Sequence, residues 1–114
     1  MAERAWIDAN QDMALALIIS ELRAARWAKE NKQGWIDLAK SVIEGYTDEA
    51  GSLDYDEIVI KLDNWPVNGG IDREMCQNTL DTSFEFGVFI LLFLCEDVVD
   101  FSFQERALEL VGRQ

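Results

Sequence analysis

The sequence predicts an all-α fold, a small single-domain bundle of four to five helices around a central apolar helix. Gly and Pro together number only eight in 114 residues, too few for the many tight turns of an all-β domain. Residues 86–95 contain no charged side chain, although 28% of the chain is charged. A surface helix would show polar residues at every turn, and ten helical residues span only about 15 Å, half of a bilayer core. We therefore expect residues 86–95 to form a buried helix at the centre of one domain covering 1–114.

The first half of the chain is expected to form an antiparallel pair of helices. Residues 8–31 are rich in Ala, and their apolar side chains recur on one helical face. Gly34 is suited to a left-handed cap that ends this helix. Residues 35–44 repeat the amphipathic pattern and give the second helix.

The next segment is ambiguous between helix and strand. Asp54 with Glu57 three residues later is typical of a capping box, which favours a helix over 55–64, ended by Pro66. β-branched residues alternate with others in the same stretch, so a short strand at 57–62 is the alternative.

The second half of the chain is expected to contain the central helix and a last helix. Asp72 is the expected N-cap of a helix that begins at 73 and either ends near 84 or continues to 99 as one element. Gly87 within a continuous helix would cost about 1 kcal/mol relative to Ala, which indicates a close crossing by another helix. Ser102 and Glu105 form a second capping-box pattern, which predicts a helix over 103–111 with Gly112 as its stop.

The net charge of −12 is confined to one part of the sequence. Residues 1–33 hold five acids and five bases, whereas residues 34–114 hold seventeen acids and five bases. Because phosphates repel such a surface, direct binding to nucleic acid or to an anionic membrane is not expected. The charge favours a protein partner with a basic surface.

The chain holds two cysteines, Cys76 and Cys95, and Cys95 lies within the apolar run. Small secreted domains use cysteines at greater density, so two buried free thiols in a reducing compartment are expected. The N-terminal residues lack the pattern of a secretory leader, which favours a cytoplasmic location.

No catalytic or cofactor motif stands out. The chain has no His, which excludes imidazole bases and most zinc sites, and it has no glycine-rich phosphate loop. Acids between 48 and 57 could supply oxygen ligands, but their spacing does not match a calcium loop. We therefore expect no metal, no cofactor and no enzymatic activity.

The functional prediction rests on the segment from Glu44 to Glu57, which holds six acids and no base. We expect it to bind the basic surface of a nuclease or a nucleic-acid-guided complex and to inhibit that target. The likeness to anti-CRISPR and anti-restriction proteins is one of size and charge only. Trp65 is the expected aromatic anchor. The predicted contact residues are Glu44, Asp48, Glu49, Asp54, Asp56, Glu57 and Trp65.

Two alternatives remain open from the sequence. The chain could be an immunity protein that neutralises a nuclease toxin, again through its acidic segment. It could instead be a structural or regulatory helical module that forms a homodimer through incompletely covered apolar surface.

Overall fold

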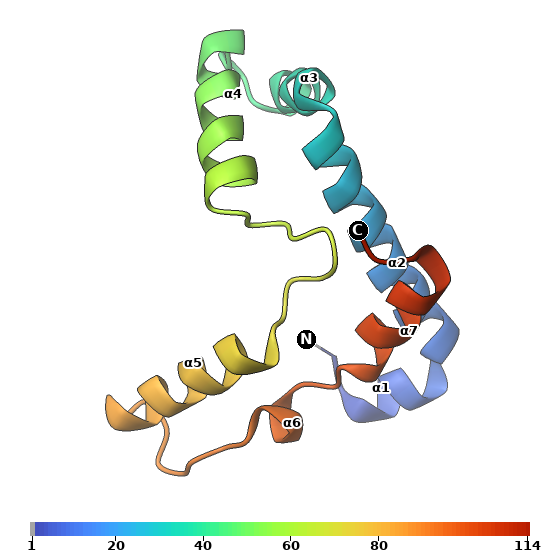
Figure 1. Cartoon of the computed structure of the whole chain (residues 1–114), viewed down its shortest axis with the longest axis vertical. Helices are drawn as coiled ribbons and strands as arrows, with labels where there is room; N and C mark the ends of the chain where they lie inside the picture. The colour runs from blue at the N-terminus through green and yellow to red at the C-terminus, as the bar shows by residue number, and fades with distance from the viewer. Residues whose placement is uncertain (1) are drawn as a thin grey trace. The chain divides into compact units, whose positions relative to one another are not determined.

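The computed structural model describes residues 2–114, which form helices and connecting loops with no strand (Figure 1). The prediction of an all-α fold is confirmed. The alternative of a strand at 57–62 is wrong, because those residues belong to a helical segment of π type. The elements are α1 (Arg4–Ala9), α2 (Gln11–Glu30), α3 (Lys32–Val42), α4 (Asp48–Asp54), the π-helix η1 (Tyr55–Lys61), α5 (Arg73–Glu85), α6 (Cys95–Val98) and α7 (Ser102–Val111).

The contacts within the chain divide it into two compact units. Unit 1 consists of the described residues up to Ile18 together with Ile71–Gly112, and unit 2 consists of Ile19–Gly70 with Arg113 and Gln114. The division falls within α2. The single-domain organisation over 1–114 stays a prediction.

The expected first helix, 8–31, is two helices in the structure. A break at Asn10 separates α1 from α2, and the Asn10 side chain donates a hydrogen bond to the Trp6 carbonyl at 2.8 Å. Helix α1 has only six residues, which is too short for an apolar repeat to identify it from the sequence. Gly34 does not end the second of these helices, since α2 already ends at Glu30. Asn31 then caps α3 by accepting a hydrogen bond from the Gly34 amide at 2.9 Å.

Helix α4, at Asp48–Asp54, precedes the helix that was predicted over 55–64. Thr47 is its N-cap and accepts a hydrogen bond from the Ala50 amide at 3.2 Å. The capping box predicted at Asp54 and Glu57 is therefore wrong, because α4 runs directly into η1 and Asp54 lies inside the continuous helical segment.

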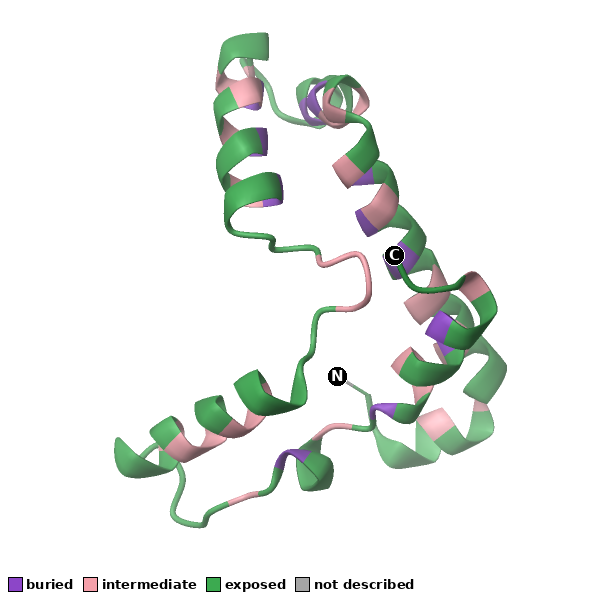
Figure 2. Ribbon diagram, in the orientation of Figure 1, coloured by how far each residue is buried: buried purple, intermediate pink, exposed green. Residues whose placement is uncertain are grey.

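Helices α3 and α4 approach each other closely in unit 2, with their buried residues on facing sides (Figure 2). A Cβ added at Gly51 would lie only 2.8 Å from Cγ2 of Ile36, which is itself buried. Next along the helix, the Tyr55 ring meets Trp35 edge-on at a centroid distance of 5.6 Å, and Val59 is completely buried.

The hydroxyl of Tyr55 forms hydrogen bonds with carbonyl groups at the end of α2. It lies 2.7 Å from the carbonyl oxygen of Ala28 and 2.9 Å from that of Lys29, and it donates to these oxygens. The last four carbonyls of an α-helix have no hydrogen-bond partner within the helix, and the Tyr55 hydroxyl is such a partner for the end of α2. The buried ring thus joins η1 to the end of α2.

In unit 1, Asp72 caps α5 as predicted, accepting a hydrogen bond from the Met75 amide at 2.9 Å. The helix ends at Glu85, so a single helix over 73–99 is wrong. The Val88 amide bonds to the Ser83 carbonyl at 2.9 Å and the Gly87 amide to the Phe84 carbonyl at 3.0 Å, the two bonds of a Schellman motif. Gly87 has φ +72°, which suits this position, and its surroundings hold no atom within 4 Å of an added Cβ. Gly87 therefore stops the helix, and the predicted close crossing is wrong.

The central apolar helix expected at 86–95 is wrong. Residues 86–94 form an irregular loop, which we call the apolar loop, and only Cys95 begins a helix. Phe86 is 81% exposed and Ile90 is 93% exposed. The absence of polar residues predicts burial in a helix, but the glycine cap ends α5 before these residues can continue it.

Helix α7 ends at Val111, followed by Gly112, as predicted. Its start differs from the prediction, because Phe101 is the N-cap residue and makes no side-chain cap. The Ser102 hydroxyl donates to Asp100 at 2.6 Å instead, and Glu105 pairs with Arg73. The predicted capping box at 102–105 is thus wrong, since both of its side chains have other partners.

Candidate protein-binding surface

Half of the acids predicted to contact a partner are ion-paired with lysines of unit 2. Two of these lysines come from α3, outside the segment in which the sequence shows no base. Pairs exposed to this degree contribute little to stability, but they reduce the negative potential that a partner would meet. The pairs are Lys40–Asp48 at 3.1 Å, Lys32–Asp56 at 2.7 Å and Lys61–Glu57 at 3.0 Å.

Asp54 is also engaged within the chain. The Tyr46 hydroxyl donates a short hydrogen bond to its carboxylate. This hydrogen bond, followed by desolvation and by the charge of Asp54, raises the pKa of Tyr46 above its ordinary value. Asp54 thus acts as a link between the α3–α4 connection and the end of α4.

The remaining predicted contacts lie on separate segments. Glu44 and Glu49 are exposed near the corner between α3 and α4, and neither forms an ion pair within residues 2–114. Trp65 is 42% exposed and lies in the connection that follows η1. Whether these residues meet a partner stays a prediction.

Unit 1 carries most of the excess negative charge. Its residues up to Ile18 hold three acids and one base, and Ile71–Gly112 hold nine acids and two bases. Unit 1 therefore has a net charge of −9, whereas the ten acids and seven bases of unit 2 leave only −3. The charge count of residues 34–114 does not distinguish the acids that pair with lysines in unit 2 from the acids of unit 1.

Four carboxylates among the described residues of unit 1 accept hydrogen bonds from neutral donors, namely backbone amides, an amide side chain and a hydroxyl. A neutral donor satisfies a carboxylate without cancelling its charge, so these side chains are ordered and still negative. These interactions are Met75 N to Asp72 at 2.9 Å, Gln77 to Asp81 at 2.9 Å, Leu94 N to Asp97 at 3.2 Å and Ser102 to Asp100 at 2.6 Å.

Asp100 shows the effect of such a donor on a carboxyl. The hydrogen bond from Ser102 is the largest cause that lowers the pKa of Asp100, and the hydrogen bond from Arg4 at 3.0 Å is the next. The charged form of Asp100 is therefore favoured in the folded chain.

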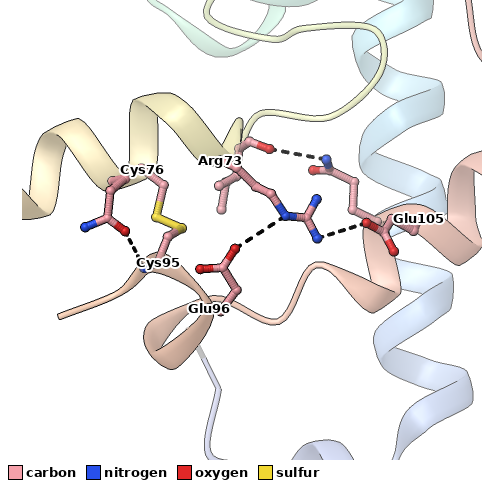
Figure 3. A network of polar contacts seen from close by, with 8 residues as sticks. Arg73, Cys76, Cys95, Glu96 and Glu105 are labelled. Carbon is pink, nitrogen blue, oxygen red and sulfur yellow. Dashed lines mark hydrogen bonds and ion pairs between the residues drawn. A yellow bond between two sulfur atoms is a disulfide. The ribbon is translucent and has the colours of Figure 1, made fainter.

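Arg73 is engaged on several sides within unit 1 (Figure 3). Its guanidinium lies 3.6 Å from Glu96 and 3.1 Å from Glu105, and it stacks over the Phe101 ring at 4.2 Å. This arginine links α5, α6 and α7, but it neutralises only part of the local charge. Acids of unit 1 that form no ion pair within residues 2–114 include Asp8, Asp12, Glu74, Glu85 and Glu109.

Cys76 and Cys95 form a disulfide, with an S–S distance of 1.99 Å and a Cα–Cα distance of 5.8 Å (Figure 3). The expectation of two free thiols is therefore wrong. Their spacing of nineteen residues leaves room for α5 to end and for the chain to turn back on it. The cytoplasmic location loses the support of free cysteines and stays a prediction.

Gln77 anchors the C-terminal end of the apolar loop beside the disulfide. Its side-chain nitrogen donates to the Phe93 carbonyl at 3.1 Å, and its oxygen accepts from the Cys95 amide at 2.9 Å. The amide side chain thus pairs with the loop backbone much as a neighbouring peptide would. The sequence carries no signal for this pairing, because Gln77 resembles any polar residue of a helix.

The opposite face of α5 carries a shallow hollow of about 590 Å³ between Asp72 and Ser83. Its walls include Glu74, Met75 and Thr79. They hold no buried charged group, so we assign the hollow no chemistry.

Within residues 2–114, no three His, Cys, Asp or Glu side chains are grouped closely enough to hold a metal ion. None of the helices in this range has both the length and the apolar character needed to cross a membrane. No family model, curated protein or solved structure shows significant similarity to the chain.

Proposed function

We propose that the chain is a small acidic binding protein that covers the basic surface of a protein acting on nucleic acid. The observation that carries the proposal is the net charge of −9 on unit 1, where acids such as Asp8, Glu74 and Glu109 form no ion pair within residues 2–114 and others accept hydrogen bonds from neutral donors. Such a surface is attracted to a groove built for phosphates and competes with them. The expected consequence of binding is inhibition of the target.

Helix α5 presents part of this charge in a regular row. Glu74, Asp81 and Glu85 are seven and four residues apart, so at 100° per residue they lie along nearly one line of the helix. At 1.5 Å per residue, their positions are about 10.5 Å and about 6 Å apart along the axis. A rigid row of carboxylates is a suitable replacement for phosphates held at fixed spacing.

Capture of a partner from the native host in the presence of competing DNA tests this function. The tagged chain should retain a basic protein at about 0.05 M salt and release it at about 0.5 M, because exposed charges are then screened. Excess duplex DNA should also displace the partner. Retention that neither salt nor DNA reduces would contradict the proposed function. Capture of a nuclease encoded beside this chain would identify it as an immunity protein.

Two matched charge reversals locate the contact. Glu74→Lys with Glu109→Lys should weaken capture at least about tenfold, because like charges then face the basic partner. Glu44→Lys with Glu49→Lys changes the net charge equally but lies in unit 2, and it should have a smaller effect. The reverse ranking would place the contact on the segment predicted from the sequence.

A further inference from the structure

On the basis of the proposed function, we infer that the apolar loop is a preformed anchor that inserts into an apolar groove rimmed by Lys and Arg on the same protein partner. The loop exposes six large apolar side chains, each by more than half. Exposed apolar side chains gathered in one short segment often mark an interaction site on a protein surface. These residues are Phe86, Val88, Ile90, Leu91, Leu92 and Leu94.

The conformation of the loop is fixed at both ends and in the middle. Gly87 holds the N-terminal end through the Schellman motif, and Gln77 and the disulfide hold the C-terminal end. Between them, the rings of Phe89 and Phe93 meet edge-on at 5.6 Å. A loop ordered before binding loses little conformational entropy when it docks, which increases the affinity available from its exposed side chains.

The composition of the loop and of the residues that flank it argues against a membrane as its binding partner. Residues 84–100 contain no Lys, Arg, Trp or Tyr, the residues that usually anchor a segment at a bilayer interface. Glu85 precedes the loop, and Glu96 and Asp97 follow it. These acids would be repelled by anionic lipid headgroups.

The same charges argue against a second copy of the chain. Two apolar loops in contact would bring Glu85 and Asp97 of one copy near those of the other, and each unit 1 carries a net charge of −9. Like charges juxtaposed at an interface are unfavourable. A partner with an apolar groove and a basic rim complements both the loop and its acidic flanks.

Photo-crosslinking in the native host tests which molecule the loop contacts. A photoreactive amino acid at position 90 replaces the most exposed residue of the loop, and the same group at Leu53 is the control, since Leu53 is 68% exposed on α4 of unit 2. The photoreactive group at position 90 should crosslink to a single protein, the same one that DNA displaces. The crosslinked peptide of that protein should contain apolar residues together with Lys or Arg. A product at twice the chain mass of 13.0 kDa, a lipid adduct, or equal labelling from Leu53 would overturn the inference.

A pair of substitutions then measures the contribution of the loop with the purified partner. Ile90→Asp should raise the Kd about 10- to 100-fold, as expected for an anchor residue, whereas Leu53→Asp should leave it within about twofold. Both side chains are exposed, so the circular dichroism spectra should match that of the parent chain. If DNA still displaces the partner but Ile90→Asp binds normally, only the docking inference fails. If Ile90→Asp abolishes binding but DNA does not compete, the docking loop stands and the proposed function fails.

Discussion

Units 1 and 2 use their apolar residues in opposite ways. Of the eleven buried apolar residues within 2–114, unit 2 contains seven, including Val59, Tyr55 and Ile36, packed between α2, α3 and the α4–η1 segment. Unit 1 contains the other four, and its most apolar stretch is the exposed loop at 86–94. Unit 1 relies on a disulfide, an arginine link and helix caps where unit 2 relies on packing. Hydrophobic composition alone therefore did not show which apolar segment is inside.

The two units also treat their acids differently. In unit 2, lysines pair with Asp48, Asp56 and Glu57, and the unit is close to neutral. In unit 1, neutral donors bond to Asp72, Asp81 and Asp97 and leave their charges uncompensated, whereas Asp100 has both Ser102 and Arg4 as donors. A run of acids in the sequence is thus a weaker sign of a negative surface than the absence of cations nearby in space.

Reduction of the disulfide should give the largest difference in stability between the two units, because the disulfide lies in unit 1. The Cys76–Cys95 link closes a loop of about twenty residues, for which chain entropy gives about 3 kcal/mol of stabilisation. We expect dithiothreitol to lower the hydrogen-exchange protection of α5 and α6 about 100-fold while α3 and α4 stay protected. The measurement is amide exchange followed by mass spectrometry.

A matched variant controls for effects of the reductant itself. Cys76→Ala with Cys95→Ala should reproduce the loss of protection without any reductant. Equal loss of protection in α3 would show that the units unfold together, and it would remove the distinction between a packed unit and a cross-linked one.

A substitution that overpacks the α3–α4 contact in unit 2 should change stability less than reduction of the disulfide does. Ala at position 51 would gain about 1 kcal/mol in helix propensity, but its Cβ would lie 2.8 Å from the buried Ile36 side chain, and overpacking costs about 1–3 kcal/mol. We expect Gly51→Ala to lower the free energy of unfolding by about 1 kcal/mol, measured by urea denaturation. Gly70→Ala is the control, because no atom lies within 4 Å of its added Cβ. A Gly51→Ala chain more stable than the parent would mean that α3 and α4 are not in close contact.

The fold class followed from the sequence, because local signals decide where most helices lie. Amphipathic spacing predicted α2 and α3, and Asp72 predicted the start of α5. The errors came from Gly87, whose left-handed cap outweighs the helical tendency of the run after it, and from Thr47, whose cap starts α4 early. Gly87 was missed as a cap because the apolar residues that follow it could equally continue a helix, whereas Gly112 was predicted as a stop.

Less of the candidate binding surface than of the fold could be predicted from the sequence. The acid count was correct, but the lysines that neutralise Asp48 and Asp56 come from α3, eight and twenty-four residues away. The Gln77 anchor and the disulfide likewise join residues sixteen to nineteen positions apart. Pairings of this kind depend on how the helices pack, so charge and cysteine patterns alone could not establish them.

The smallest expected effect concerns Asp100, which has both a neutral and a cationic donor in unit 1. Its pKa is lowered from the ordinary value of 3.8, first by Ser102 and then by Arg4, so its contribution to stability is present above 3.8 and is lost as the pH falls through the lowered pKa. Ser102→Ala should therefore raise the pKa of Asp100 toward 3.8 in an NMR titration, and Arg4→Gln should raise it less. Ser41→Ala in unit 2 is the control and should leave this titration unchanged, since Ser41 bonds to the Leu38 carbonyl. A larger shift with Arg4→Gln would mean that a cation dominates even here, and it would weaken the contrast between the neutral donors of unit 1 and the lysines of unit 2.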